Sequence, residues 1–252
     1  MIYGLYLSAA GALASQHRME VIANNLANVQ TTGFKRDLAT FREAPLEADL
    51  RRAPAAFRHP VADGIGGGIF AQPTFTDLRP GPLRHTRDPS DLAIAGEGFF
   101  VVDTPAGKRL TRDGRISISP AGHLVRATDG LALLGANGEQ IRVDPAQGLQ
   151  VASDGTVQQE GVAVSRLAVV RTADREDLRK AGGGLFRVLG EAGTRPADAR
   201  VRQGYLEDSG VEPTTELTNL ILANRSYELN ARMLQQQDQT LGRLINTVAS
   251  LR

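Results

Sequence analysis

Residues 213–252 decide the fold, and they read PTTELTNLILANRSYELNARMLQQQDQTLGRLINTVASLR. Positions on one helix face recur there at alternating steps of three and four, which is the spacing of a heptad seam. These positions are Leu217, Leu220, Asn224, Tyr227, Ala231, Leu234, Asp238, Leu241, Ile245 and Val248. Pro213 and Glu216 are typical of a helix start. We predict one long helix, whose regular seam favours a coiled coil over an ordinary amphipathic helix packed on its own domain.

The N-terminal residues 1–33 show the same spacing. The positions that share a face are Leu5, Ala9, Ala12, Gln16, Met19, Ala23 and Leu26. Gly4, Ser8 and Gly11 are small, so a second backbone could approach closely beside them. We expect a second helix that runs to about Gly33, where glycine can take the left-handed conformation that ends a helix.

Between the two helices the helical period disappears, and short apolar runs alternate with turn dipeptides. Strands are expected at 91–103, 108–111, 115–119, 123–126, 130–134, 140–143, 149–152, 164–171, 184–189 and 200–206. Asp113-Gly114, Asp129-Gly130, Asn137-Gly138 and Asp154-Gly155 are typical of hairpin turns. The pattern predicts an antiparallel β-rich domain over 91–206, preceded by an extended connection rich in proline and glycine over 37–90. The fold class is therefore α+β.

Composition excludes several classes of protein. The 252 residues carry 29 Lys and Arg against 28 Asp and Glu, a net charge of +1 that argues against a nucleic-acid binder. The chain has no cysteine, which excludes disulfides and thiolate metal sites. The first residues lack the pattern of a cleavable signal peptide, and no apolar run is long enough to insert in a membrane.

Catalytic and metal-binding motifs are missing. The histidines His17, His59, His85 and His123 are scattered without the spacing of a zinc site. There is no G-x-S-x-G elbow, and the glycines at 64–68 lack the residues that complete a phosphate loop. Aromatic residues are only 5% of the chain, which disfavours a carbohydrate-active or adhesive surface protein. We expect no enzyme activity, no catalytic residues, no cofactor and no metal.

Residues 24–36 read NNLANVQTTGFKR and resemble the N-terminal signature of flagellar rod and hook proteins, NNxANxxTxGFK, at every fixed position. Residues 91–102, followed by 110–114, resemble the start of that family's β-domain. Residues 216–230 are similar to its C-terminal helix, although Asn224 replaces the usual glutamine and Ser226 the usual alanine. Length and β-domain resemble the rod members of the FlgF/FlgG type. Within it, the proximal-rod type FlgF is favoured and the distal-rod type FlgG stays the alternative.

The resemblance implies a structural subunit of the basal-body rod, whose two terminal helices pair as a coiled coil in the assembled rod. It implies an inner helical layer from residues 1–36 and 207–252, with the β-domain outside. The implied partners are other rod subunits and the flagellar type III export apparatus. The implied location is the periplasm-spanning rod, reached without a cleavable signal. The interface residues expected are Leu5, Ala12, Met19, Asn24, Asn25, Asn28, Gly33, Phe34, Leu217, Leu220, Tyr227, Leu234, Leu241, Ile245 and Val248.

One rival interpretation shares the predicted elements. A β-domain protein could use the same helices in a closed homo-oligomeric bundle and have no flagellar role. The rod interpretation predicts open helical association, and the rival predicts a closed point group.

Overall fold

The computed structural model describes residues 2–43, 68–172, 177–189 and 193–249. The fold is α+β, with a β-rich domain, an N-terminal helix and a C-terminal helix. The chain divides into two compact units. The first unit comprises residues 1–27, 37–75 and 213–252, and the second comprises 28–36 and 76–212. Both helices therefore belong to the first unit.

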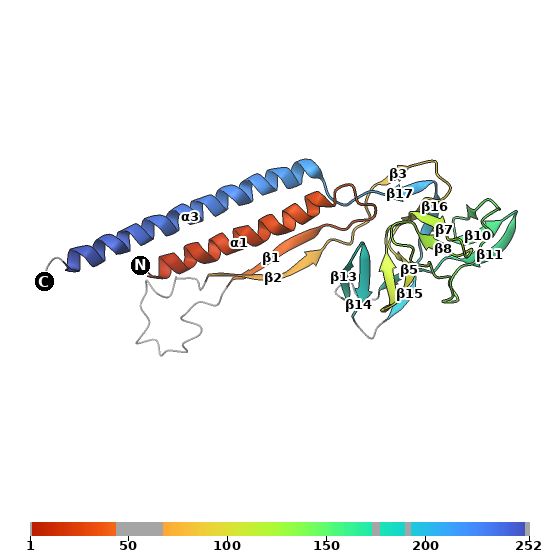
Figure 1. The fold of residues 1–252 in the computed structure, drawn as a ribbon, viewed down its shortest axis with the longest axis horizontal. Helices are drawn as coiled ribbons and strands as arrows, with labels where there is room; N and C mark the ends of the chain where they lie inside the picture. Colours follow the sequence, from red (N-terminus) through yellow and green to blue (C-terminus); the bar gives the residue numbers. More distant parts are fainter. Residues whose placement is uncertain (1, 44–67, 173–176, 190–192, 250–252) are drawn as a thin grey trace. The chain divides into compact units, whose positions relative to one another are not determined.

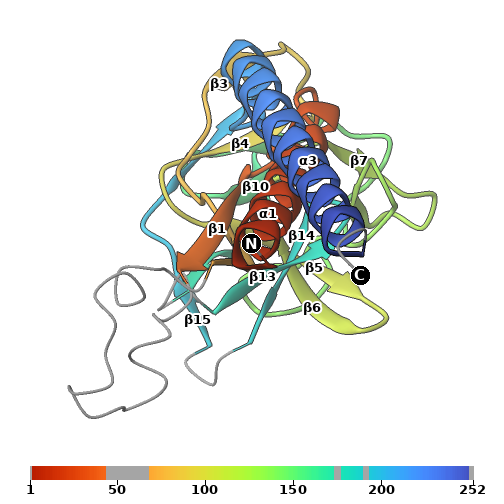
Figure 2. The ribbon, with the colours of Figure 1, turned by 90° about the vertical axis from the view of Figure 1, so that its left-hand side faces the viewer.

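The first unit is built on a pair of helices, α1 (Ile2–Ala27) and α3 (Pro213–Ala249). They lie side by side and run in opposite directions, as Figures 1 and 2 both show. Strand β1 (Asp37–Glu43) packs against α1 and pairs with β2 (Ile69–Thr76). The part of the predicted connection between these strands, residues 44–67, lies outside the described residues.

Helix α3 begins at Pro213, as the sequence predicts. Helix α1, in contrast, ends at Ala27, and the expectation that it continues to Gly33 is wrong. Asparagine side chains compete for backbone partners at this end. The Asn25 amide donates to Asp37 O at 2.8 Å, and its Oδ1 accepts from Asp37 N at 2.9 Å. This clamp fixes the chain after it has turned away from the helix axis.

The second unit consists of short strands joined by turns. They are β3 (Leu83–His85), β4 (Leu92–Ala95), β5 (Phe99–Thr104), β6 (Gly107–Thr111), β7 (Ile116–Ile118), β8 (Leu124–Arg126), β9 (Gln150–Val151), β10 (Thr156–Gln159), β11 (Val162–Arg166), β12 (Val169–Thr172), β13 (Leu178–Gly182), β14 (Leu185–Val188), β15 (Thr194–Pro196), β16 (Arg200–Gln203) and β17 (Tyr205–Glu207). The largest sheet has the order β13-β14-β6-β5-β12-β15, and its pairs are antiparallel. Smaller sheets join β11-β10-β9, β16-β4, β17-β3 and β7-β8.

Strand β5 lies at the centre of the core because both of its faces are buried. Phe100 and Val102 point into one apolar cluster, together with Leu92 and other side chains. Phe99 and Val101, one residue out of step, point into the second cluster on the opposite face. Side chains alternate along a strand, so the continuous apolar run in the sequence is that of a strand covered on both sides.

Several local expectations are wrong. The single strands predicted over 164–171 and 200–206 are each divided in two, into β11 and β12 and into β16 and β17. The single strand predicted over 91–103 is interrupted, because Gly96 and Gly98 have φ of 117° and 146° and separate β4 from β5. Asp113-Gly114 is not a hairpin turn. An added Cβ on Gly114 would lie 1.7 Å from Leu92 O, so glycine permits a close backbone approach there. The runs 130–134 and 140–143 pair only through isolated bridges.

Candidate assembly interface

The inner faces of α1 and α3 meet through small side chains. An added Cβ on Gly11 would lie 2.8 Å from Asn230 Oδ1. One turn further along α1, Ser15 Oγ donates to Ser226 Oγ at 3.1 Å. The two contacts run in opposite directions along the two helices, which sets the antiparallel register. Small residues at these contacts therefore let the two backbones approach closely.

Helix α3 carries two adjacent heptad faces, and the structure places them differently. The residues that are buried or half-buried along it are Glu216, Leu220, Ala223, Asn230, Ala231, Leu234, Gln237 and Leu241. Leu220, Leu234 and Leu241 of the predicted interface are among them. Leu217 and Tyr227, which the sequence places on the same seam, are 47% and 38% exposed. The side chains of Ile245 and Val248 lie outside the description.

Large apolar side chains on the first half of α3 are exposed. We call the following residues the outer stripe: Leu217, Ile221, Leu222, Leu229 and Met233, which are 47% to 62% exposed. The exposed residues at every seventh position from Thr218 to Gln239 are instead polar throughout. At 100° per residue the polar positions lie between Leu217 and Ile221 on one flank and Leu222, Leu229 and Met233 on the other. Large apolar side chains exposed together in this way mark a site of interaction on a protein surface.

Helix α1 repeats the arrangement. Tyr6, Leu7 and Leu13 are exposed, Leu13 to 66%. The predicted interface residues Leu5, Ala12 and Met19 are half-buried or buried, and Asn24 is exposed. Asn25 is only 1% exposed and holds the backbone of Asp37 within its own chain.

The other predicted positions in the signature segment, Asn28, Gly33 and Phe34, lie in the second unit. Gly33 has φ of 67°, and its N–H donates to Glu207 O at 2.8 Å. An added Cβ there would lie 2.6 Å from the carbonyl carbon of Arg112, so only glycine fits. Phe34 is 9% exposed, and the Lys180 ammonium lies 4.0 Å from the centre of its ring.

Next to them, Lys35 is buried in a charged network. Its Nζ lies 2.5 Å from Glu207 Oε1, and Arg112 Nη1 lies 2.8 Å from Glu207 Oε2. Lys35 Nζ also donates to Arg79 O at 2.6 Å, and Gly81 N donates to Glu207 Oε1 at 2.9 Å. All three charged side chains are 1% exposed. The signature is therefore fixed inside the β-rich unit by ionic contacts that satisfy both carboxylate oxygens.

Burial changes the electrostatics of this network. Desolvation lowers the pKa of Lys35 from its ordinary 10.5, and the charge of Glu207 acts in the opposite direction. Desolvation also lowers the pKa of Arg112, again against Glu207. Two cations on one carboxylate leave an excess positive charge in a dry site, which makes the carboxylate indispensable. Nothing in the sequence pointed to Glu207, because 171 residues separate it from Lys35 along the chain.

The described residues contain no group of three or more His, Asp or Glu side chains arranged to hold a metal ion. Among the same residues, neither helix combines the length and apolar character that crossing a bilayer requires.

Three family models match the chain, and each covers one of these regions. The flagella basal body rod protein model matches residues 5–35, which contain α1 and the signature. The flagellar hook protein FlgE/F/G D1 domain model matches residues 93–159 of the β-rich unit. The flagellar basal body rod FlgEFG protein C-terminal model matches residues 202–247, which contain Glu207 and most of α3.

Curated relatives match over nearly the full length. The flagellar basal-body rod protein FlgF of Caulobacter vibrioides is 36% identical over 91% of both chains. The flagellar basal-body rod protein FlgG of Bacillus subtilis is 31% identical over 98% of this chain and 99% of its own. The FlgG of Caulobacter vibrioides is 31% identical over 94% of this chain and 96% of its own.

Proposed function

The chain belongs to the flagellar basal-body rod protein family of the FlgF/FlgG type and is a structural subunit of the rod; we propose that it joins neighbouring subunits through the outer faces of α1 and α3. A closed bundle without a flagellar role has no support from these relatives. A structural subunit also needs no catalytic centre.

The outer stripe carries the proposal. Leu222 and Leu229 are 58% and 62% exposed on a helix whose inner face is already occupied by α1. Burial of a leucine side chain is worth about 1.5–3 kcal/mol, so water is an unfavourable final environment for this stripe. A contact between two different surfaces of identical copies generates an open helical polymer when the rotation between copies does not close into a ring. Of the predicted interface positions, Leu217 and Tyr227 are exposed and available to such a neighbour.

We infer the finer assignments from the family. The partners are other rod subunits, with delivery by the flagellar type III export apparatus to the periplasm-spanning rod. In the rod, α1 and α3 contribute to an inner coiled-coil layer. A FlgF-type proximal position is favoured by the Caulobacter vibrioides pair, because its FlgF is 36% identical to this chain and its FlgG 31%.

The test is a double substitution on the outer stripe, Leu222→Asp with Leu229→Asp. Exposed substitutions usually change stability by less than about 0.5 kcal/mol, so the monomer is expected to keep its helical circular dichroism. Cells that carry the variant are expected to export the subunit, build truncated basal bodies and stop swimming. The defect recurs at every subunit, so a modest loss per contact prevents assembly.

Gln239→Asp is the control, because Gln239 is one of the exposed polar residues that recur at every seventh position of α3 from Thr218. This variant is expected to swim normally. Rods of normal length in the double variant, or an equal loss of swimming in the control, would show that the outer stripe is not the interface.

A further inference from the structure

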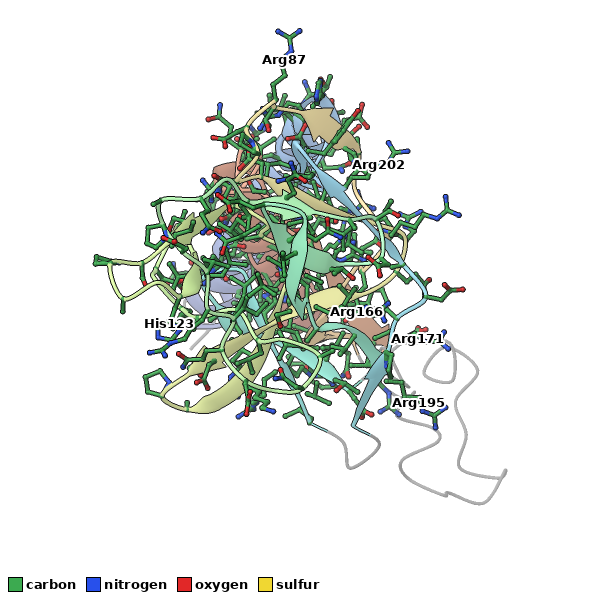
Figure 3. The ribbon with its side chains drawn as sticks, turned by 90° about the vertical axis from the view of Figure 1, so that its right-hand side faces the viewer. Arg87, His123, Arg166, Arg171, Arg195 and Arg202 are labelled. Atoms are coloured by element: carbon green, nitrogen blue, oxygen red, sulfur yellow. The ribbon has the colours of Figure 1, made fainter. Side chains whose placement is uncertain are left out.

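A strip of arginines on the second unit has no role in the helix contacts. It consists of Arg166, Arg171, Arg195, Arg200 and Arg202, on strands β11, β12, β15 and β16, and all five are exposed. We call it the basic strip. In Figure 3 Arg166, Arg171, Arg195 and Arg202 lie along one side of the unit, and His123 lies on the opposite side.

Two members of the basic strip face each other across a strand pair. Arg171 and Arg195 are direct register partners in β12 and β15, held by the flanking pairs Val170 with Pro196 and Thr172 with Thr194. Like charges directly opposite each other destabilise a sheet. Within the described residues neither guanidinium has a carboxylate partner. An anionic surface placed over the pair would convert this repulsion into attraction.

A second arginine pair in the same sheet differs from the first, because one of its guanidinium groups has a hydrogen-bond partner. Arg179 and Arg187 are register partners in β13 and β14, at the other edge of the same sheet. There Arg179 is engaged, since its Nη1 donates to Leu178 O at 3.0 Å. Arg171 and Arg195 have no such contact with the residues that the structure describes. Positive charge and Pro196 on the edge strand β15 also discourage backbone pairing, so a partner would meet the side chains.

The chain itself carries the complementary charge. Residues 127–161 contain five carboxylates and one arginine, a net charge of 1 − 5 = −4. Residues 162–203 contain nine Lys and Arg and five Asp and Glu, a net charge of 9 − 5 = +4. These two consecutive segments therefore carry net charges of opposite sign, and opposite charges on one chain favour head-to-tail contact between identical copies.

Within the acidic part, Asp144 and Glu160 form an exposed pair on neighbouring segments. Asp144 N donates to Gln159 Oε1 at 2.9 Å, and Gln159 Nε2 donates back to Asp144 O at 2.8 Å, which holds Glu160 nearby. Both carboxylate side chains are exposed. Arg142, two residues before Asp144, forms a β-bridge with His123, the residue that Figure 3 places opposite the arginines. Glu160 follows β10 in the sheet β11-β10-β9, whereas Arg171 and Arg195 lie on β12 and β15 of the six-stranded sheet. Arg166 is the member of the basic strip nearest to the acidic part, because β11 pairs with β10 and Arg166 Nε donates to Asp154 O at 3.0 Å.

We propose that the basic strip of one subunit, centred on Arg171 and Arg195, docks on Asp144 and Glu160 of the next copy of the chain. The inference rests on the proposed function, because it adds a second contact between β-rich units to the contacts between helices. Opposite charges steer the approach of the subunits, and the fixed register of the arginine pair selects one orientation.

The experiment uses two full-length variants with opposite changes. The first, Arg171→Glu with Arg195→Glu, leaves both surfaces acidic. The second, Asp144→Lys with Glu160→Lys, leaves both surfaces basic. Self-association of each variant alone is expected to weaken at least about tenfold in sedimentation at about 0.05 M salt, where screening is weak. An equal mixture of the two is expected to recover association, and co-expression is expected to recover swimming.

A matched control is Arg179→Glu with Arg187→Glu, which makes the same change in net charge on the other cross-strand pair. It is expected to associate and swim as the parent does. Normal association of the Arg171 and Arg195 variant would overturn the proposal. So would folded variants that each fail and do not recover when mixed, because Asp144 and Glu160 would then not be the partner of the basic strip. Either result leaves the outer-stripe test of the rod function unaffected.

Discussion

The two units bury different kinds of side chain. In the β-rich unit, large apolar residues such as Leu92, Phe100 and Val157 are at most 1% exposed. In the helical unit, the inner seam is formed at Gly11 and Ser15, and Leu13 is 66% exposed. A domain that encloses its own large residues is self-sufficient, whereas a helix pair that leaves many of them outside gains more of its stability from packing by neighbours.

The difference extends to charge. The β-rich unit encloses Lys35, Glu207 and Arg112 at 1% exposure each, with hydrogen bonds to both carboxylate oxygens. Charged residues on α3 are instead mostly at the surface, as in the exposed pair Arg232 and Glu228, whose side chains are 72% and 52% exposed. Substitutions of the buried charges should therefore affect folding, and substitutions of exposed residues on α3 should affect assembly.

The largest effect on folding is expected from Glu207→Gln. The amide group would present its NH2 to a cation, either Lys35 or Arg112, and both cations would lose their only close anion within the network. Breaking a buried ion pair costs about 3–5 kcal/mol, so the midpoint of urea unfolding, followed by circular dichroism of the β signal, should fall strongly.

Asp208→Asn is the matched control, one residue along the chain. Its partner Arg84 is 56% exposed and Asp208 itself 41%, so the expected loss is below about 1 kcal/mol. Equal losses in the two variants would mean that burial does not govern the network, and the contrast between the units would weaken.

The parts of the fold that depend on local sequence were predictable. The proline and glutamate at the start of α3 place its first residue, and Gly130, Gly138 and Gly155 take the left-handed φ of 72°, 81° and 84° that turn dipeptides predict. Such signals act through the backbone of a few consecutive residues. Family membership was predictable for a related reason, since the signature is a continuous string.

The choice of helix face was not predictable in the same way. Leu220, Leu234 and Leu241 belong to both heptad faces of α3, so periodicity alone cannot decide which face meets α1. Gly11 decides it, because close contact of the backbones selects the face that carries Asn230. The Glu207 network was equally hidden, since contacts between distant segments leave no spacing in the sequence.

A smaller effect is expected from Gly11→Leu in the helical unit. Leucine favours helix over glycine by about 0.8 kcal/mol. However, even a Cβ at this position would lie 2.8 Å from Asn230 Oδ1. Overpacking costs about 1–3 kcal/mol, so steric conflict prevails. The thermal midpoint of the helical signal should decrease. Ala23→Leu, at an exposed α1 position, should change it little; if both variants melt alike, the small-residue seam does not hold the helices together.

The smallest effect concerns acid stability of the β-rich unit. Hydrogen bonds from the Arg79 guanidinium hold the pKa of Asp77 below its ordinary 3.8. A folded-state pKa below the unfolded value means that the unfolded chain binds more protons, so this stabilisation is present above about pH 4 and is lost as pH falls through the lower folded value. Because the Arg79 side chain is 73% exposed, solvent screens the pair and its contribution is small. Urea midpoints of the parent should fall slightly more between about pH 6 and pH 3 than those of Asp77→Asn. Arg79→Met should remove the same increment, and the double variant should lose no more than either single one. Identical pH dependence in the parent and both single variants would show that the pair adds nothing to the stability that the β-rich unit derives from its core.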